Sequence, residues 1–357
     1  MPLQPCDEED AAPVVVRFPA LGDAVLLTPL LDALHARYGK KVKVLASGDW
    51  TPVLLGQHPA VGELCMVRSR RAPFWLMPSQ WRAVRWLRRQ RGPVYLCEAD
   101  PHALRLVSRA VGPEQMVKAW EHWPGNDIHW ADWWLQIAQL DPLALPGPQP
   151  RDVTGTQGQP TLALPDAWAD DAAQWLKSRR LSGDSLVLVQ PGHKKTHKRG
   201  RIATAHHDKH WPAERWAAVI RGILASDPAL TVLVCGSPRE HGLAQEIVDA
   251  AGAPLRVLNG ARELPLQRLV ALAACAHSMV SVDTGPAHVA AAMDCPSVVM
   301  FGQFGWGRWK PRAPRADVVA LGPQAPTPGC SVMHIEVDEV LKAWRSLRPR
   351  QSQRSAA

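Results

Sequence analysis

The feature that most constrains the fold is a repeated alternation of short apolar runs with segments of helical spacing. An apolar, β-rich run covers 14–18, a turn follows it, and apolar residues then recur every three or four positions over 24–38. Further apolar runs cover 43–46 and 94–97. Strand, turn, helix and strand in this order predict the opening of a doubly wound α/β domain.

The second half of the chain repeats this rhythm. Short apolar strands alternate there with helices, which predicts a second parallel sheet because strands buried on both faces read as continuous apolar runs. We expect strands at 186–189, 231–236, 278–282 and 297–301 and helices at 212–224, 243–251, 266–276 and 286–293.

The length of 357 residues exceeds one ordinary hydrophobic core and fits two domains. The segment 141–160 is rich in Pro, Gly and Gln, which is typical of a linker. We expect an N-terminal domain over 14–150, a C-terminal domain over 160–335, a C-terminal helix over 336–348, and disordered ends at 1–13 and 349–357.

Composition and charge limit the class of protein. The seven cysteines include no Cys-x-x-Cys pair and are odd in number, so we expect buried free thiols rather than a disulfide framework or a zinc site. No apolar run approaches the ~20 residues of a membrane span, and the acidic start does not resemble a signal peptide, which predicts a cytoplasmic protein. A net charge of +8 favours anionic partners, namely nucleic acid, phosphorylated lipid surfaces or sugar phosphates.

Leu21-Gly22-Asp23 follows the first predicted strand. Ligands of open α/β sheets bind beyond the carboxyl ends of the strands, so Asp23 is a candidate site residue. An Asp at this place also serves as a cap for the helix that follows, and both interpretations stay open.

The segment 283–288, Asp-Thr-Gly-Pro-Ala-His, joins a predicted strand to a predicted helix. Gly285 permits close approach of a ligand to the backbone, and the helix start offers amide protons and partial positive charge to a phosphate. His288 lies one short turn into that helix. The alternative is a simple helix cap with a structural histidine.

Two further segments lie near expected strand ends. Lys209 precedes a helix that Pro212 helps to start, where a cation would meet a diphosphate; the alternative is a solvated loop lysine. The Gly- and Trp-rich segment 301–309 forms either a lip over a site or a packed turn.

Together these segments resemble glycosyltransferase family nine, the ADP-heptose:lipopolysaccharide heptosyltransferases. The order and spacing fit over about residues 14 to 345, and the combination is specific whereas any single piece is not. The residues that carry the resemblance are 15–17, 21–23, 28–31, 208–212, 281–288, 290–291, 296 and 301–302.

The resemblance implies a GT-B architecture, in which two Rossmann-like domains face each other across a cleft. The first domain would hold the acceptor and the second the nucleotide-sugar. Asp23 is then the expected general base, and Lys209 is expected to bind the donor diphosphate and to assist its departure. The expected donor-binding residues are Thr204, Lys209, Asp283, Thr284, Gly285 and His288.

The implied reaction is inverting transfer of a sugar, expected to be heptose from ADP-heptose, to a lipopolysaccharide core or related glycan. Such transfer passes through an oxocarbenium-like state, and the acceptor hydroxyl loses its proton to a positioned carboxylate. Lys209 and the helix start at Thr284 are expected to stabilise the departing diphosphate. We expect no metal and no cofactor, since the sequence has no Asp-x-Asp triplet to bridge a metal to the diphosphate.

The run 68–91 holds eight arginines and no acidic residue. Arg82, Arg85 and Arg89 share one helix face by their spacing, and two tryptophans lie among them. We expect this face to bind an anionic, lipid-linked glycan acceptor, with the protein at the periphery of the inner membrane. The alternative is a solvated basic face.

Two departures from the family pattern lie near the expected donor site. The basic stretch 193–201 looks like an insertion, and Gln303-Phe304 stands where the family usually has Pro-Thr. They bear on the identity of the donor sugar more than on the reaction.

Three other interpretations compete with this one. A basic, anion-binding protein directed at nucleic acid has no recognition motif to support it, so we expect no nucleic-acid partner. A non-catalytic family member would lack Asp23 or Lys209, and both are present. A nucleotide-sugar epimerase shares the two-domain architecture only by analogy.

Overall fold

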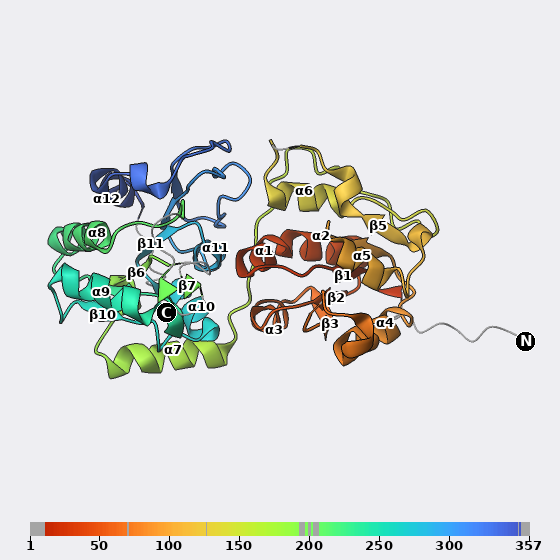
Figure 1. The fold of residues 1–357 in the computed structure, drawn as a ribbon, viewed down its shortest axis with the longest axis horizontal. Helices are drawn as coiled ribbons and strands as arrows, with labels where there is room; N and C mark the ends of the chain where they lie inside the picture. Colours follow the sequence, from red (N-terminus) through yellow and green to blue (C-terminus); the bar gives the residue numbers. More distant parts are fainter. Residues whose placement is uncertain are drawn as a thin grey trace, which may run out of the picture. The chain divides into compact units, whose positions relative to one another are not determined.

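The chain divides into two units in the computed structural model, one from Met1 to Ala163 and one from Leu164 to Ala357 (Figure 1). Both are α/β units built on a parallel sheet, which confirms the expected fold class. The terminal segments expected to be disordered lie largely outside the described residues, as do Thr204 and most of 193–201. The structure describes residues 11–69, 71–125, 127–192, 197–198, 201–202, 207–348 and 350.

Unit 1 contains a five-stranded parallel sheet in the order β3-β2-β1-β4-β5. Val16 of β1 is level with Leu45 of β2 and with Leu96 of β4, so β1 lies between these two strands. The strand order reverses between β1 and β4, which is the switch point where doubly wound sheets bind ligands. The strands are β1 (Val14–Val16), β2 (Val42–Ala46), β3 (Val61–Met66), β4 (Val94–Leu96) and β5 (Met116–Lys118).

Helices cover both faces of this sheet. α4 and α5 share one apolar core with β1 and β4, and α2 packs against α6. The helices are α1 (Leu21–Leu26), α2 (Thr28–Tyr38), α3 (Trp50–Leu55), α4 (Pro78–Leu87), α5 (Pro101–Val107) and α6 (Trp130–Ile137), with short 3-10 turns η2 (Phe74–Leu76), η3 (Pro113–Gln115) and η4 (Ala119–His122).

Two helices, α1 and α2, replace the single helix predicted over 24–38. Pro29 has no N–H to donate to the carbonyl of Val25, so the continuous hydrogen-bond ladder stops there. The hydroxyl of Thr28 donates to the Val25 carbonyl instead, at 2.9 Å. Helix α1 also begins earlier than predicted, at Leu21, which places Asp23 in its first turn.

Unit 2 contains a six-stranded parallel sheet in the order β10-β9-β6-β11-β12-β13, the arrangement of a dinucleotide-binding sheet. Its switch point lies between β6 and β11, where Val189 is level with Val280. The strands are β6 (Leu186–Gln190), β9 (Thr231–Val234), β10 (Val257–Asn259), β11 (Ser278–Val282), β12 (Ser297–Met300) and β13 (Val318–Leu321). β7 (His197–Lys198) pairs antiparallel with β8 (Arg201–Ile202) in a separate two-stranded sheet.

The helices of unit 2 also lie on both faces. α8, α9 and α12 share one core, which includes the buried rings of Trp211 and Trp216, and α7 and α10 share the other (Figure 1). The helices are α7 (Asp166–Ser178), α8 (Ala213–Ser226), α9 (His241–Ala251), α10 (Leu266–Cys275), α11 (Gly285–Ala292) and α12 (Val337–Arg345), with 3-10 turns η5 (Gly183–Ser185), η6 (Pro238–Glu240) and η7 (Val332–His334).

The six described cysteines are all free, as expected. Cys97, Cys235 and Cys295 are buried, whereas the other three are half-buried. Within the described part of the chain, each helix is too short or too polar to traverse a lipid bilayer.

Candidate functional site

An ion pair stands at the switch point of unit 2. The Nζ of Lys209 donates to Asp283 Oδ2 at 2.6 Å and to the Asp283 backbone carbonyl at 3.0 Å. Both side chains are largely buried, with exposed fractions of 20% and 15%. Asp283 directly follows β11, so the structure brings two predicted donor-site residues together at the carboxyl end of the central strands.

Helix α11 starts beside this pair. Gly285 is its first residue, and Thr284 precedes it in an extended conformation without forming a side-chain cap. His288 is buried, with Nε2 4.0 Å from Asp283 Oδ1. The amide groups at the helix start and the Lys209 ammonium therefore place positive charge at one strand end, which suits an anionic ligand.

Asp208 fixes the loop that carries Lys209. Its Oδ2 accepts the backbone N–H of Gln303 at 3.1 Å, and its carbonyl accepts the N–H of Val332 at 2.8 Å. A Cβ atom added to Gly302 would lie 2.5 Å from Asp208 Oδ2, so this contact requires glycine. The sequence showed Asp208 only as part of a motif, because its partners lie far along the chain.

A second carboxylate at this edge was not predicted. Glu240 follows β9 and caps η6, where Oε2 accepts the N–H and the hydroxyl of Ser237, both at 2.8 Å. Its Oε1 is buried and has no hydrogen-bond partner among the described residues. An unsatisfied buried oxygen can accept a ligand hydroxyl. The Ser-Pro-x-Glu spacing is a cap signature that marks this position in the sequence.

In unit 1, Asp23 lies beyond the end of β1. Its Oδ2 accepts the N–H of Ala20 at 3.3 Å. Asp23 therefore caps α1, which is one of the two interpretations of this residue from the sequence. The same oxygen lies 3.6 Å from Nη2 of Arg17, and the side chain remains 31% exposed. Capping thus leaves the carboxylate accessible to a ligand.

Arg17 connects Asp23 to a third group, Glu98. Arg17 is buried at the end of β1, and Glu98 follows β4 across the switch point. Nη1 of Arg17 donates to the Cys97 carbonyl at 2.7 Å and lies 3.5 Å from Glu98 Oε1. Glu98 Oε1 also accepts the N–H of Phe18 at 2.6 Å. One guanidinium therefore sits between two carboxylates, and sequence reasoning missed Glu98 although it directly follows a predicted strand.

Five tryptophans pack together beside Arg17. Trp133 and Trp134 stack with ring centroids 4.3 Å apart, and the Arg17 guanidinium lies 5.4 Å from the centre of the Trp130 ring. We call Trp120, Trp123, Trp130, Trp133 and Trp134 the tryptophan cluster.

Helix α4 exposes the predicted basic face. It buries Ala83, Val84 and Leu87, so Arg82 and Arg85 point to solvent, and Arg89 just past its end is exposed as well. Trp86 does not join that face, because its Nε1 donates to Glu63 Oε1 at 2.7 Å.

The Gly- and Trp-rich segment forms a packed turn. Trp306 and Trp309 pack against a small core that contains the buried Phe301, and Phe304 is 58% exposed.

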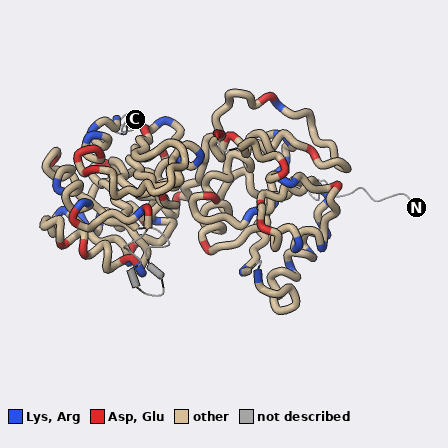
Figure 2. The backbone as a smooth tube through the Cα atoms, turned by 45° about the horizontal axis from the view of Figure 1, so that its top comes forward, with Lys and Arg blue, Asp and Glu red and all other residues tan. Residues whose placement is uncertain are grey.

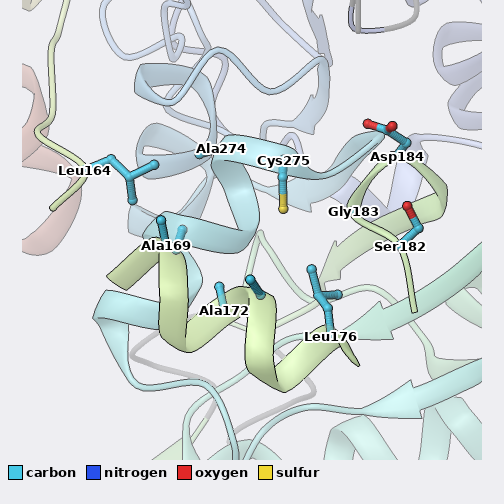
Figure 3. Close-up of a pocket in the computed structure, with 11 residues that line it drawn as sticks. Leu164, Ala169, Ala172, Leu176, Ser182, Gly183, Asp184, Ala274 and Cys275 are labelled. Atoms are coloured by element: carbon cyan, nitrogen blue, oxygen red, sulfur yellow. The ribbon is translucent and has the colours of Figure 1, made fainter. Parts of the chain in front are cut away.

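A cavity of about 390 Å³ lies between α7 and α10 (Figure 3). Its walls are mostly small or apolar, and Cys275 lines it with a thiol whose pKa is raised by burial. Gly183 and Asp184 line one side of the cavity and precede β6, whereas Asp283 follows the neighbouring parallel strand β11. This side of the cavity thus lies at the amino ends of the strands, and Asp283 lies at their carboxyl ends. The cavity is separate from the ion pair.

Comparison with known proteins adds sequence evidence. Residues 178–334 match the family described as "Glycosyltransferase family 9 (heptosyltransferase)". Lipopolysaccharide heptosyltransferase 1 of Escherichia coli (strain K12) is 34% identical over 131 residues, which are 34% of this chain and 40% of that protein. Lipopolysaccharide heptosyltransferase 2 of Salmonella typhimurium is 30% identical over 115 residues, which are 32% of each chain. The match to these relatives thus spans well under half of their length.

Solved structures show the same fold. A family 9 glycosyl transferase from Veillonella parvula superimposes with a TM-score of 0.74 at 17% identity, covering 93% of this chain and 95% of that one. The E. coli ADP-heptose heptosyltransferase II gives a TM-score of 0.68 at 20% identity, covering 93% and 97%. The fold extends over both units, whereas the family match lies in the unit that carries Lys209 and Asp283. Residues 178–334 are therefore similar in sequence to glycosyltransferase family 9, and both units share the fold of the solved structures named above.

Proposed function

We propose that this chain is an inverting glycosyltransferase that moves heptose from ADP-heptose to a lipopolysaccharide core or a related glycan. The observation that carries the proposal is the Lys209–Asp283 pair at the switch point of unit 2, inside the family-matched segment. Among proteins of the same fold, the E. coli heptosyltransferase WaaC is described with ADP and with ADP-2-deoxy-2-fluoro heptose.

We assign the donor to unit 2. An ammonium carries three protons, and two of those on Lys209 go to Asp283, which leaves one for a phosphate oxygen. That proton and the start of α11 stabilise the charge that gathers on the departing diphosphate. Thr204, Asp283, Thr284, Gly285 and His288 complete the proposed donor site.

We assign the acceptor to unit 1. Asp23 removes the proton of the attacking hydroxyl, and Arg17, held by Glu98, keeps the carboxylate in place. One displacement at an oxocarbenium-like centre then inverts the sugar. Arg82, Arg85 and Arg89 bind the anionic part of a lipid-linked acceptor, which places the enzyme in the cytoplasm at the surface of the inner membrane.

The direct test is release of ADP. Purified protein is incubated with ADP-heptose and core lipopolysaccharide, and in parallel with UDP- and GDP-sugars. We expect ADP release only when both donor and acceptor are present. Donor binding without transfer, seen as a rise in melting temperature with ADP-heptose but no ADP release, would instead favour a non-catalytic family member.

A further inference from the structure

Unit 1 exposes an apolar knob that its own fold does not cover. Trp75 and Leu76 on η2 are 69% and 55% exposed, and Trp81 on α4 is 47% exposed. We call these three residues the Trp75 knob. Large apolar side chains that gather on a surface mark a contact site for a partner or a membrane.

The knob has a firm base. Phe74 lies beneath it with its ring centroid 6.5 Å from that of Trp81, and the Arg109 guanidinium lies 4.4 Å from the centre of the Phe74 ring. Helix α4, which follows η2, buries Ala83 and Val84 in the core of unit 1. The knob is therefore presented on a packed element.

Positive charge surrounds the knob. Arg71 precedes it; its side chain is 74% exposed, and its Nε lies 3.8 Å from Asp100 Oδ2. Arg82, Arg85 and Arg88 are exposed on and just after α4. Helix α5 packs beside α4 and adds the exposed Arg105. No acidic residue occurs between positions 63 and 98 of the sequence. Figure 2 marks these basic positions in blue along the tube.

We infer that the Trp75 knob and its arginines dock on an anionic phospholipid bilayer. Tryptophan prefers the boundary between headgroups and acyl chains, where its ring is half apolar and half hydrated. Arginines around it are attracted to the negative surface of an anionic leaflet. An apolar knob inside a basic rim combines the two features that such a surface recognises. The inference rests on the proposed function only in naming the inner membrane as the bilayer that is bound.

Vesicle sedimentation tests this without any sugar donor. Full-length protein is mixed with vesicles of phosphatidylcholine alone or of phosphatidylcholine and phosphatidylglycerol in equal parts. We expect binding to the anionic vesicles that weakens as salt is added, and much weaker binding to the neutral ones. Trp75→Ser with Leu76→Ser should lower the partition coefficient by about tenfold or more.

Matched variants separate the knob from general effects. Leu143 and Leu255 are 94% and 92% exposed and lie outside this surface, so Leu143→Ser with Leu255→Ser should bind vesicles like the native protein. Arg71→Gln with Arg88→Gln should reduce both binding and its salt dependence, whereas Lys342→Gln with Arg345→Gln on α12 should not.

Melting temperatures show whether each variant is folded. Two results would overturn the inference and favour a soluble protein as the partner. One is native-like vesicle binding by a folded Trp75→Ser, Leu76→Ser variant, and the other is a native protein that does not bind anionic vesicles. If the native protein does not bind anionic vesicles but still transfers sugar to a detergent-solubilised acceptor, the proposed function stands without the membrane contact.

Discussion

The ammonium of Lys209 and the carboxylate of Asp283 are held together at 2.6 Å, although they lie 74 positions apart in the sequence. In the proposed donor site, the cation would attract a bound diphosphate, whereas the carboxylate would repel it. Their effects on an anionic ligand are consequently coupled, and removal of either residue exposes the charge of the other.

Lys209→Ala should weaken ADP binding and lower turnover by about a hundredfold, because the leaving diphosphate loses its cation and meets an uncompensated Asp283. Asp283→Asn added to this variant should restore part of the ADP affinity, so the two changes are not additive. Calorimetric titration with ADP measures the affinity of each variant. Lys177→Ala, at an exposed position on α7, is the control. Additive losses would mean that the pair acts only in folding.

Asp23→Asn separates capping from catalysis. The amide oxygen can still accept the N–H of Ala20, so the cap of α1 survives, but the residue no longer accepts a proton. We expect turnover to fall by about two orders of magnitude or more with an unchanged affinity for ADP. The exposed Asp49→Asn, also in unit 1, should be silent. Near-normal turnover of Asp23→Asn would leave this residue with the capping role alone.

Gly302→Ala should disturb the donor site from a distance. The new methyl group would fall 2.5 Å from Asp208 Oδ2 and 2.7 Å from its carbonyl, so the loop before Lys209 must move. We expect kcat/KM to fall about a hundredfold, the cost of a displacement near 1 Å at a reacting centre. Gly242→Ala in α9 meets no atom within 4 Å and should stabilise the protein by up to about 1 kcal/mol. Equal behaviour of the two variants would contradict the role of Asp208.

Charge reversal on α4 tests acceptor binding. Arg82→Glu with Arg85→Glu should reduce the apparent affinity for the lipid acceptor by about tenfold or more and flatten its salt dependence. Affinity for ADP should stay as it is. Steady-state kinetics at several salt concentrations give both quantities. Unchanged acceptor kinetics would show that these arginines form only a solvated basic face.

Stability of unit 1 should fall in mild acid because of His58. Burial lowers the pKa of this histidine, against an opposing effect of Asp32. Its Nδ1 accepts the N–H of Ala60, and Nε2 lies 2.9 Å from the hydroxyl of Thr161. The folded state favours the neutral ring, so its contribution is complete above the unfolded pKa of about 6.5 and is lost as the pH falls through the lower folded pKa.

Denaturant unfolding at a series of pH values measures this contribution. His58→Gln should make the free energy of unfolding less dependent on pH below neutrality, and the exposed His122→Gln is the matched control. An identical pH profile for His58→Gln and the native protein would show that His58 does not contribute.

Whether a strand could be predicted from the sequence depends on its position in the sheet. In the two parallel sheets, the four unpredicted strands, β3, β5, β10 and β13, are the edge strands, and every predicted one is interior. Edge strands bury less of their surface, as in β13, where each residue is only half-buried. β3, β5 and β10 contain a glycine or polar residues and lack the continuous apolar run by which an interior parallel strand is recognised. β13 is an apolar run of four residues that the sequence prediction missed.

The candidate site divides in a similar way. Lys209, Asp283 and His288 belong to short motifs at strand ends, and local sequence was enough to select them. Asp208 and Glu98 act through partners about eighty or more positions away, and those partners are chosen by strand order. Strand order depends on the packing of the whole sheet, so no local pattern predicts these contacts.

The tryptophan cluster gives unit 1 an optical signature of its own. Trp133 and Trp134 lie nearly parallel, with 25° between their ring planes, whereas Trp211 and Trp216 in unit 2 are almost perpendicular at 87°. Indole transitions at these separations couple, and the sign and size of the resulting circular dichroism depend on the angle between the rings. The two units should therefore report their unfolding through different bands, and their order of melting can be followed in the unlabelled protein.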